Sequence, residues 1–137
     1  MNCLRLSIAV VALGFPALAW AKPVLVFETP GRTRYYIDDT SAVELKLREG
    51  TVVMARVTSK SAPDPRMTAG QVAADGLMQF RCADNSYRQW NVFSIGREGS
   101  RNQVIAPDAA RAFTATRPDS FERRLLVAAC ALKRKVP

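Results

Sequence analysis

Apolar and polar residues alternate along several stretches of the chain, which is the pattern of strands in a half-buried sheet. In 42–47, for example, every second residue is apolar: Val43, Leu45 and Leu47. Residues that favour turns separate these stretches. The pattern therefore predicts strands at 23–28, 33–37, 42–47, 51–58, 77–82, 87–95 and 103–106.

The segment 118–132 has a longer period and predicts a helix. It opens with Pro118, and Asp119 is followed three residues later by Glu122, a pairing that resembles a capping box. One stripe of this helix is apolar and holds Phe121, Leu125, Ala128 and Leu132. The second half of the segment is apolar all round, so a buried strand is the alternative.

Two segments interrupt this rhythm. Prolines and small polar residues fill 60–74, which predicts a long loop with a functional or mobile role, and the Asp75-Gly76 pair after it is expected to start the second hairpin. The basic residues of 133–135 predict a frayed tail.

Together the elements predict an α+β fold, in which hairpins form a mostly antiparallel meander and the C-terminal helix docks on one face of the sheet.

The N-terminus carries the features of a secretory signal. Arg5 precedes an apolar run, and Ala19-Trp20-Ala21 fits a small-x-small cleavage site. We expect 1–21 to be cleaved, which leaves 22–137 as a single domain in the periplasm or outside the cell; a retained anchor is the alternative. Because the run is short, we expect no integral membrane segment in the mature chain.

Export gives the cysteines a structural role. Cys3 leaves with the signal, and an oxidising compartment favours one disulfide between Cys82 and Cys130. Two free or metal-binding thiols are the alternative. The chain has no histidine and no clustered cysteines, so we predict no metal and no other cofactor.

The whole chain has a formal net charge of +8, of which Arg5 contributes one. A basic mature domain suits acidic partners such as an anionic glycan or an acidic protein. Nucleic acid fits the charge but not the compartment, so we do not expect it as a partner. A general contribution to solubility is the other interpretation of this charge.

No residue pattern argues for catalysis. The commonest general base is absent with histidine, and neither a nucleophile elbow nor a phosphate-binding glycine loop occurs. The cluster of Tyr35, Tyr36, Asp38 and Asp39 is the one that offers reactive groups, but adjacent Asp, Thr and Ser side chains are ordinary in turns. We therefore predict that the protein is not an enzyme.

Candidate partner-binding residues come from the charge pattern and the aromatic residues. The cations of the helix and tail are predicted to form a basic surface, with Arg81 and Arg88 as candidate contributors from the hairpin; a solvated helix face is the alternative. Exposed Tyr and Trp side chains often anchor interfaces. The candidates are Arg123, Arg124, Lys133, Arg134, Lys135, Tyr36 and Trp90.

Three segments in order resemble the surface-adhesin protein E family of exported bacterial proteins. They are Tyr35-Tyr36-Ile37-Asp38 with Ser41, then Cys82-Ala83-Asp84-Asn85-Ser86-Tyr87-Arg88, and finally Pro118-x-Ser120 with Leu125-Leu126 and Cys130. The resemblance implies an antiparallel sheet flanked by a helix, one disulfide, and adhesion to host matrix and plasma glycoproteins, with a homodimer as one form.

These observations favour a non-enzymatic exported domain that binds an acidic or host-matrix partner through a sheet face or the basic helix and tail. The alternative is a periplasmic accessory protein, an assembly factor or an inhibitor, that binds another envelope protein.

Overall fold

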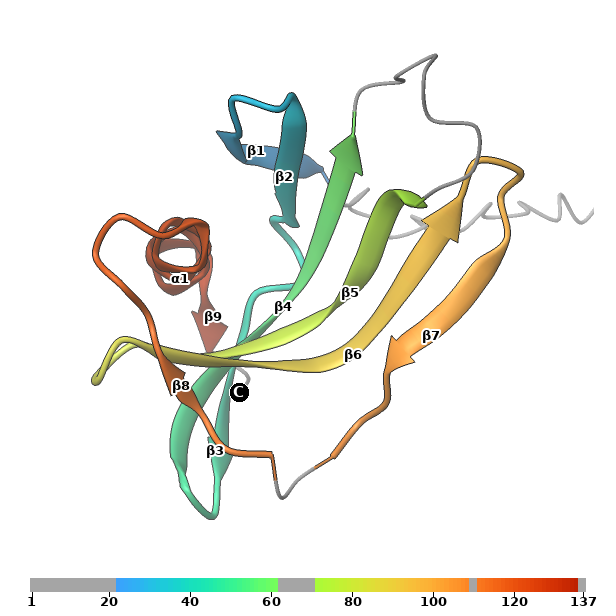
Figure 1. The fold of residues 1–137 in the computed structure, drawn as a ribbon. Helices are drawn as coiled ribbons and strands as arrows, with labels where there is room; N and C mark the ends of the chain where they lie inside the picture. Colours follow the sequence, from blue (N-terminus) through green and yellow to red (C-terminus); the bar gives the residue numbers. More distant parts are fainter. Residues whose placement is uncertain (1–21, 62–70, 109–110, 136–137) are drawn as a thin grey trace, which may run out of the picture.

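The computed structural model describes residues 22–61, 71–108 and 111–135. The predicted signal peptide at 1–21 and most of the predicted loop at 60–74 therefore lie outside the described residues. One curved sheet and one helix account for the described chain (Figure 1). Their bounds, in chain order, are β1 Pro23–Glu28, β2 Thr33–Asp38, β3 Val43–Leu47, β4 Gly50–Ser61, β5 Gln71–Arg81, β6 Ser86–Gly96, β7 Arg101–Ile105, β8 Thr114–Ala115, α1 Phe121–Leu132 and β9 Arg134–Lys135.

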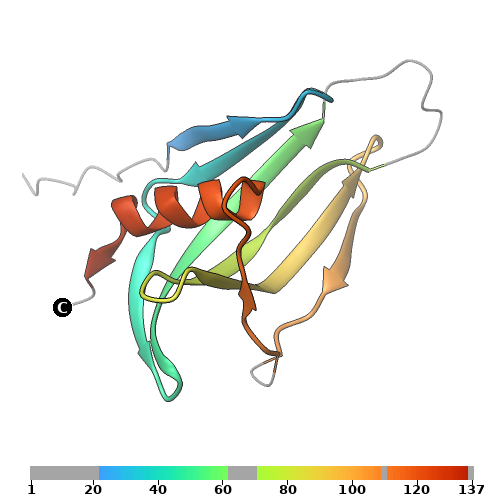
Figure 2. The same ribbon diagram turned by 60° about the vertical axis from the view of Figure 1, so that its left-hand side comes forward.

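The main path of the sheet runs β1-β2-β4-β5-β6-β7, and each neighbouring pair on it is antiparallel. The short strands β3 and β8 pair antiparallel with β4 and β6, while β9 pairs parallel with β3. The helix crosses one face of the sheet over β1, β2 and β4, as Figure 2 shows. We call this the inner face and the opposite one the outer face. The predicted fold, an antiparallel sheet with a docked C-terminal helix, is confirmed.

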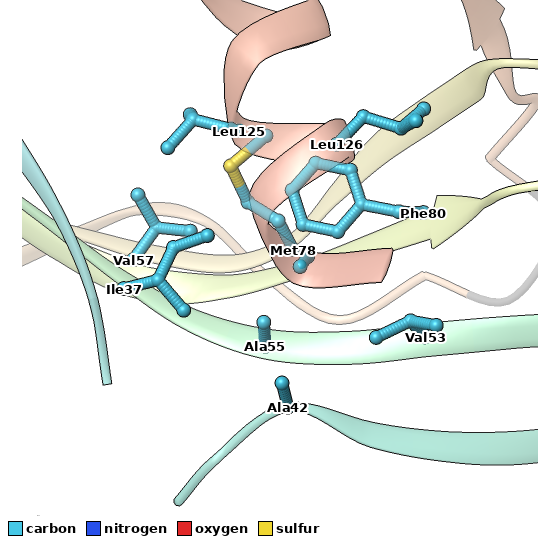
Figure 3. Packing of buried hydrophobic residues seen from close by; sticks show 10 residues of the cluster. Ile37, Ala42, Val53, Ala55, Val57, Met78, Phe80, Leu125 and Leu126 are labelled. Atoms are coloured by element: carbon cyan, nitrogen blue, oxygen red, sulfur yellow. The ribbon is translucent and has the colours of Figure 1, made fainter. Parts of the chain in front are cut away.

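The core lies between α1 and the inner face. Strand residues two apart point to the same side, so alternate positions of β4 and β5 meet the helix. Met78 and Phe80 of β5 point toward Leu125 and Leu126 (Figure 3), and all four side chains are buried. The buried residues of this cluster are Ile37, Ala42, Val53, Ala55, Val57, Met78, Phe80, Leu125, Leu126 and Ala129.

The helix forms as predicted, and the buried-strand alternative is wrong. Its cap differs from the expectation: Ser120 is the N-cap, and its hydroxyl accepts from the backbone N–H of Arg123 at 3.3 Å. Asp119 lies one residue before the cap, so it cannot form the predicted capping box with Glu122. The most buried face is that of Leu125, Leu126 and Ala129 rather than the stripe that the spacing indicated.

Two segments predicted as irregular belong to the sheet. β4 runs through Lys60 and Ser61, and β5 begins at Gln71, so Asp75-Gly76 lies inside a strand and does not mark the start of the second hairpin. The prediction of a frayed tail is also wrong for Arg134 and Lys135, because these two residues form β9. Arg134 donates its backbone N–H to the carbonyl of Ala42 at 2.8 Å, which joins β9 to β3.

The disulfide between Cys82 and Cys130 is present, with an S–S distance of 2.01 Å, and confirms the predicted pairing. It links the residue that follows β5 to the last turn of α1. Together with the β3–β9 pairing, it attaches the helix to the sheet by bonds that do not depend on apolar packing.

Candidate functional site

The outer face carries a row of cations that are far apart in the sequence. The pattern of residues along the chain did not predict that they lie together. Sheet pairing places β2, β4 and β5 side by side, so that Tyr36 lies opposite Thr58 and Thr58 opposite Asp75. Positions of the same parity then share the outer face. We call the charged and aromatic members of this surface the outer basic strip: Arg34, Arg56, Lys60 and Arg101, the carboxylates of Glu28, Asp38 and Asp75, and the rings of Tyr36 and Phe93.

Asp75 is the centre of the strip. Arg56 donates two hydrogen bonds to its carboxylate, from Nε to Oδ1 at 2.9 Å and from Nη2 to Oδ2 at 2.7 Å. Arg101 approaches the same carboxylate from β7 at 3.4 Å. The side chain of Asp75 is largely buried, whereas the side chains of Arg56 and Arg101 are about half exposed. One buried negative charge therefore orders two cations that still reach solvent.

Aromatic rings support the cations on either side of Asp75. The guanidinium carbon of Arg101 lies 3.5 Å from the ring centre of Phe93, and Nζ of Lys60 lies 5.8 Å from that of Tyr36. Arg34 is paired with Glu28 at 2.8 Å. Asp38, two residues after Tyr36 on β2, is a third carboxylate and lies near enough to Arg56 to interact with it. Four cations therefore face three carboxylates, and the strip keeps an excess of one positive charge. An array of Arg and aromatic side chains is the composition found at the centres of interfaces.

The hydrogen bonds from Arg56 lower the pKa of Asp75 below its usual value, against the opposing effect of burial. A carboxyl whose pKa is lower in the folded state stabilises the fold above the unfolded pKa, near 3.9, and loses this contribution as the pH falls through the folded pKa. We expect the melting temperature of Asp75→Asn to lie below that of the wild type at neutral pH and the gap to narrow below about pH 4. Thermal unfolding followed by circular dichroism across this range tests it. Two parallel pH profiles would contradict it.

Arg88, a suggested contributor to the basic surface, is instead buried. Its side chain donates to Gln79 Oε1 at 2.7 Å, to the carbonyl of Arg111 at 2.8 Å and to Glu49. Phe113 covers the guanidinium group at 4.4 Å. Arg88 therefore fastens the segment around 111–113 to the outer face, and it is a structural cation.

The predicted partner-binding residues fall into separate places. Arg124 packs its guanidinium group over the ring of Phe27 at 4.5 Å, and Lys133 pairs with Glu44 at 3.0 Å. Arg123 and Arg124 lie on α1, while Arg134 and Lys135 form β9. Tyr36 lies in the outer basic strip, and Trp90 lies beside Arg88 at 5.1 Å. A partner-binding role for these residues stays a prediction.

The inner face carries a hollow beside α1, between the helix and β7. The hollow has a volume of about 360 Å³. Phe121 and Leu125 of the helix form one wall, and Val104 and Ile105 of β7 form the other. We call it the inner groove. Its remaining lining residues are Tyr35, Val57, Ser59, Ala74, Asp75, Gly76, Met78, Gln89 and Val92.

Within the described residues, no helix is long and apolar enough to span a membrane. The same residues hold no group of three or more histidine, cysteine or acidic side chains that suits a metal ion. Comparison of the chain with known protein families, with curated proteins and with solved structures finds no match. The outer basic strip and the inner groove are therefore interpreted from their own chemistry.

Proposed function

We propose that the protein is an exported, non-enzymatic binding domain that holds an acidic partner on the outer basic strip. The observation that carries this proposal is the arrangement of Arg56 and Arg101 around Asp75, which fixes two half-exposed guanidinium groups on a rigid sheet. Arg side chains with unused donors recognise carboxylate and sulfate groups in a planar, directional way.

An anionic glycan is the partner class that fits best. Its acidic groups would meet the guanidinium and ammonium groups, and its ring faces would pack beside Tyr36 and Phe93. Such binding agrees with the resemblance to the surface-adhesin protein E family, whose adhesion to host glycoproteins is part of the same proposal. Nucleic acid shares the charge, but the proposed export makes it a poor candidate. No cofactor enters this function.

If the outer basic strip is the binding site, reversing charges on the strip should weaken heparin binding more than reversing charges on the helix and tail. We expect Arg34→Glu combined with Lys60→Glu to weaken binding to heparin, a sulfated polysaccharide, by about tenfold or more at 50 mM salt. Affinity measured by calorimetry should also fall steeply with salt for the wild type, because exposed charges are screened.

The matched control has the same change in net charge on the helix and tail, Arg124→Glu combined with Arg134→Glu. We expect this pair to retain affinity within about threefold. Loss of binding in the control alone would assign the site to the helix and tail and overturn the proposal for the strip. Equal losses in both pairs would mean that only the net charge matters.

A second function is favoured by one observation, the inner groove. An apolar hollow bounded by Val104, whose side chain is exposed, suits a protein partner better than a glycan. We keep the periplasmic accessory role, in which the domain binds another envelope protein, as the alternative on this ground. A homodimer would be one form of such an interface.

A further inference from the structure

The groove wall that carries Val104 is also an edge of the sheet. β7 pairs with β6 on one side, and no described strand pairs with its other side. An edge strand presents a row of backbone N–H and C=O groups to whatever lies beside it. The edge runs along β7 (Figure 1), and two residues of this strand, Val104 and Ile105, also line the inner groove.

The opposite edge strand, β1, has features that oppose pairing with a further strand, and β7 has fewer of them. β1 begins with Pro23 and has an irregular register between Leu25 and Phe27, two features that discourage further strand pairing. β7 has no proline, and its single charged residue is Arg101. It has a register shift of its own opposite Val92 and Phe93, where Val104 is the extra residue and lines the groove.

The two sides of β7 differ in chemistry. Val104 and Ile105 line the apolar groove on the inner face, and Val104 is 57% exposed. On the outer face, Arg101 contacts Asp75 and Phe93, and Gln103 donates to Asn91 at 2.8 Å. A strand added beside β7 would place alternate side chains on these two faces.

We propose that β7 is a docking edge for an extended segment of a partner protein in which apolar and acidic residues alternate. The segment's backbone would continue the sheet, its apolar side chains would enter the inner groove, and its acidic side chains would face Arg101. Strand addition of this kind obtains affinity from main-chain hydrogen bonds and specificity from pockets for alternate side chains. This inference is independent of glycan binding by the strip, although Arg101 belongs to both surfaces.

The groove suits such a segment better than a separate small ligand. Its volume of about 360 Å³ is near the lower limit for small-molecule pockets, which is room for a few side chains. A free apolar molecule would leave the edge of β7 unpaired, whereas a peptide uses the edge and the groove together. Positive charge at Arg101 selects acidic over basic residues at the alternate positions.

The test uses the full mature chain and three labelled peptides measured by fluorescence anisotropy. The first alternates valine and glutamate over eight residues. The second has the same composition with the four valines and the four glutamates in separate blocks. The third repeats the first with methylated backbone nitrogens at every second residue, on the side meant to face β7. We expect the first to bind at least tenfold more tightly than the other two.

A matched pair of variants tests whether the peptide binds at β7. Val104→Asp should weaken binding of the alternating peptide at least tenfold, while Val127→Asp, at a valine 59% exposed on α1, should leave it within twofold. Backbone amides of 101–105 should also become protected from hydrogen exchange when the wild type binds the peptide. Should Val104→Asp fail to fold, the methylated peptide and the exchange measurement still decide, because both use the wild type.

Some results would overturn the proposal. They are equal binding of the alternating and block peptides, equal effects of the two valine variants, and unchanged exchange of the β7 amides. Heparin binding separates this proposal from the function of the strip, because Val104→Asp should keep heparin affinity within about threefold of the wild type. If heparin fails to bind while the alternating peptide binds as described, the strip proposal falls and the edge proposal stands.

Discussion

Leu125→Asp is expected to remove roughly 3–5 kcal/mol of folding free energy, the scale for an unpaired charge in a protein interior. The side chain of Leu125 is 1% exposed and lies over Met78, between the helix and the sheet (Figure 3). A carboxylate there would lose its hydration and find no cation within the apolar cluster. Since a domain of this size has a total stability of about 5–15 kcal/mol, the variant should lose a large share of it and unfold at a much lower urea concentration than the wild type.

An exposed position on the same helix serves as the control. Val127→Asp makes the same chemical change two residues later, at a position that is 59% exposed, and should shift stability by less than about 1 kcal/mol. Urea unfolding of the two variants, followed by tryptophan fluorescence, gives the comparison. Equal midpoints would mean that the inner face of α1 is not packed on the sheet.

The arrangement of strands could be predicted because burial on one face imposes alternation. Val43, Leu45 and Leu47 indicated β3 correctly, and the predicted first strand has the bounds of β1. The helix was clear for a related reason: apolar residues at its spacing have to meet an apolar surface. The disulfide followed from the number of cysteines left after the predicted cleavage, and the structure confirms the pairing.

The start of the second hairpin was predicted wrongly because tertiary partners decide it. Asp75-Gly76 was expected to begin the hairpin, but β5 begins at Gln71, and Arg56 satisfies the carboxylate of Asp75 within the sheet. The backbone beside Gly76 is also closely approached, because an added Cβ would lie 2.5 Å from the carbonyl oxygen of Asn91. Glycine here therefore permits an irregular strand pairing and does not reverse the chain.

The candidate sites depend on register, which the sequence does not display. Alternation tells which residues of a strand share a face, but not which residue of the next strand lies opposite. Lys60 and Tyr36 are 24 positions apart in the chain, and the β2–β4 pairing brings them together. The inner groove was equally hidden, because it exists where the helix ends short of β7. Tyr36 was the single strip residue that its side-chain type alone had indicated.

Breaking the disulfide is the second change with a large expected effect. Cys82 and Cys130 are separated by 48 positions, and the chain-entropy model gives on the order of 4 kcal/mol for closing a loop of that length. The double variant Cys82→Ala with Cys130→Ala should therefore unfold at a much lower urea concentration than the oxidised wild type. Reduction of the wild type should produce nearly the same shift.

The way in which the disulfide stabilises the fold can also be tested. If the bond acts mainly by restricting the unfolded chain, the double variant should keep the native far-ultraviolet circular dichroism spectrum at low temperature, because the helix is still fixed by Leu125, Leu126 and the β3–β9 pairing. Alkylation of unreduced wild type should label neither cysteine, and reduction under denaturing conditions should expose both. Two labelled thiols in the unreduced protein, or equal urea midpoints with and without the bond, would show that apolar packing and β9 alone hold the helix on the sheet.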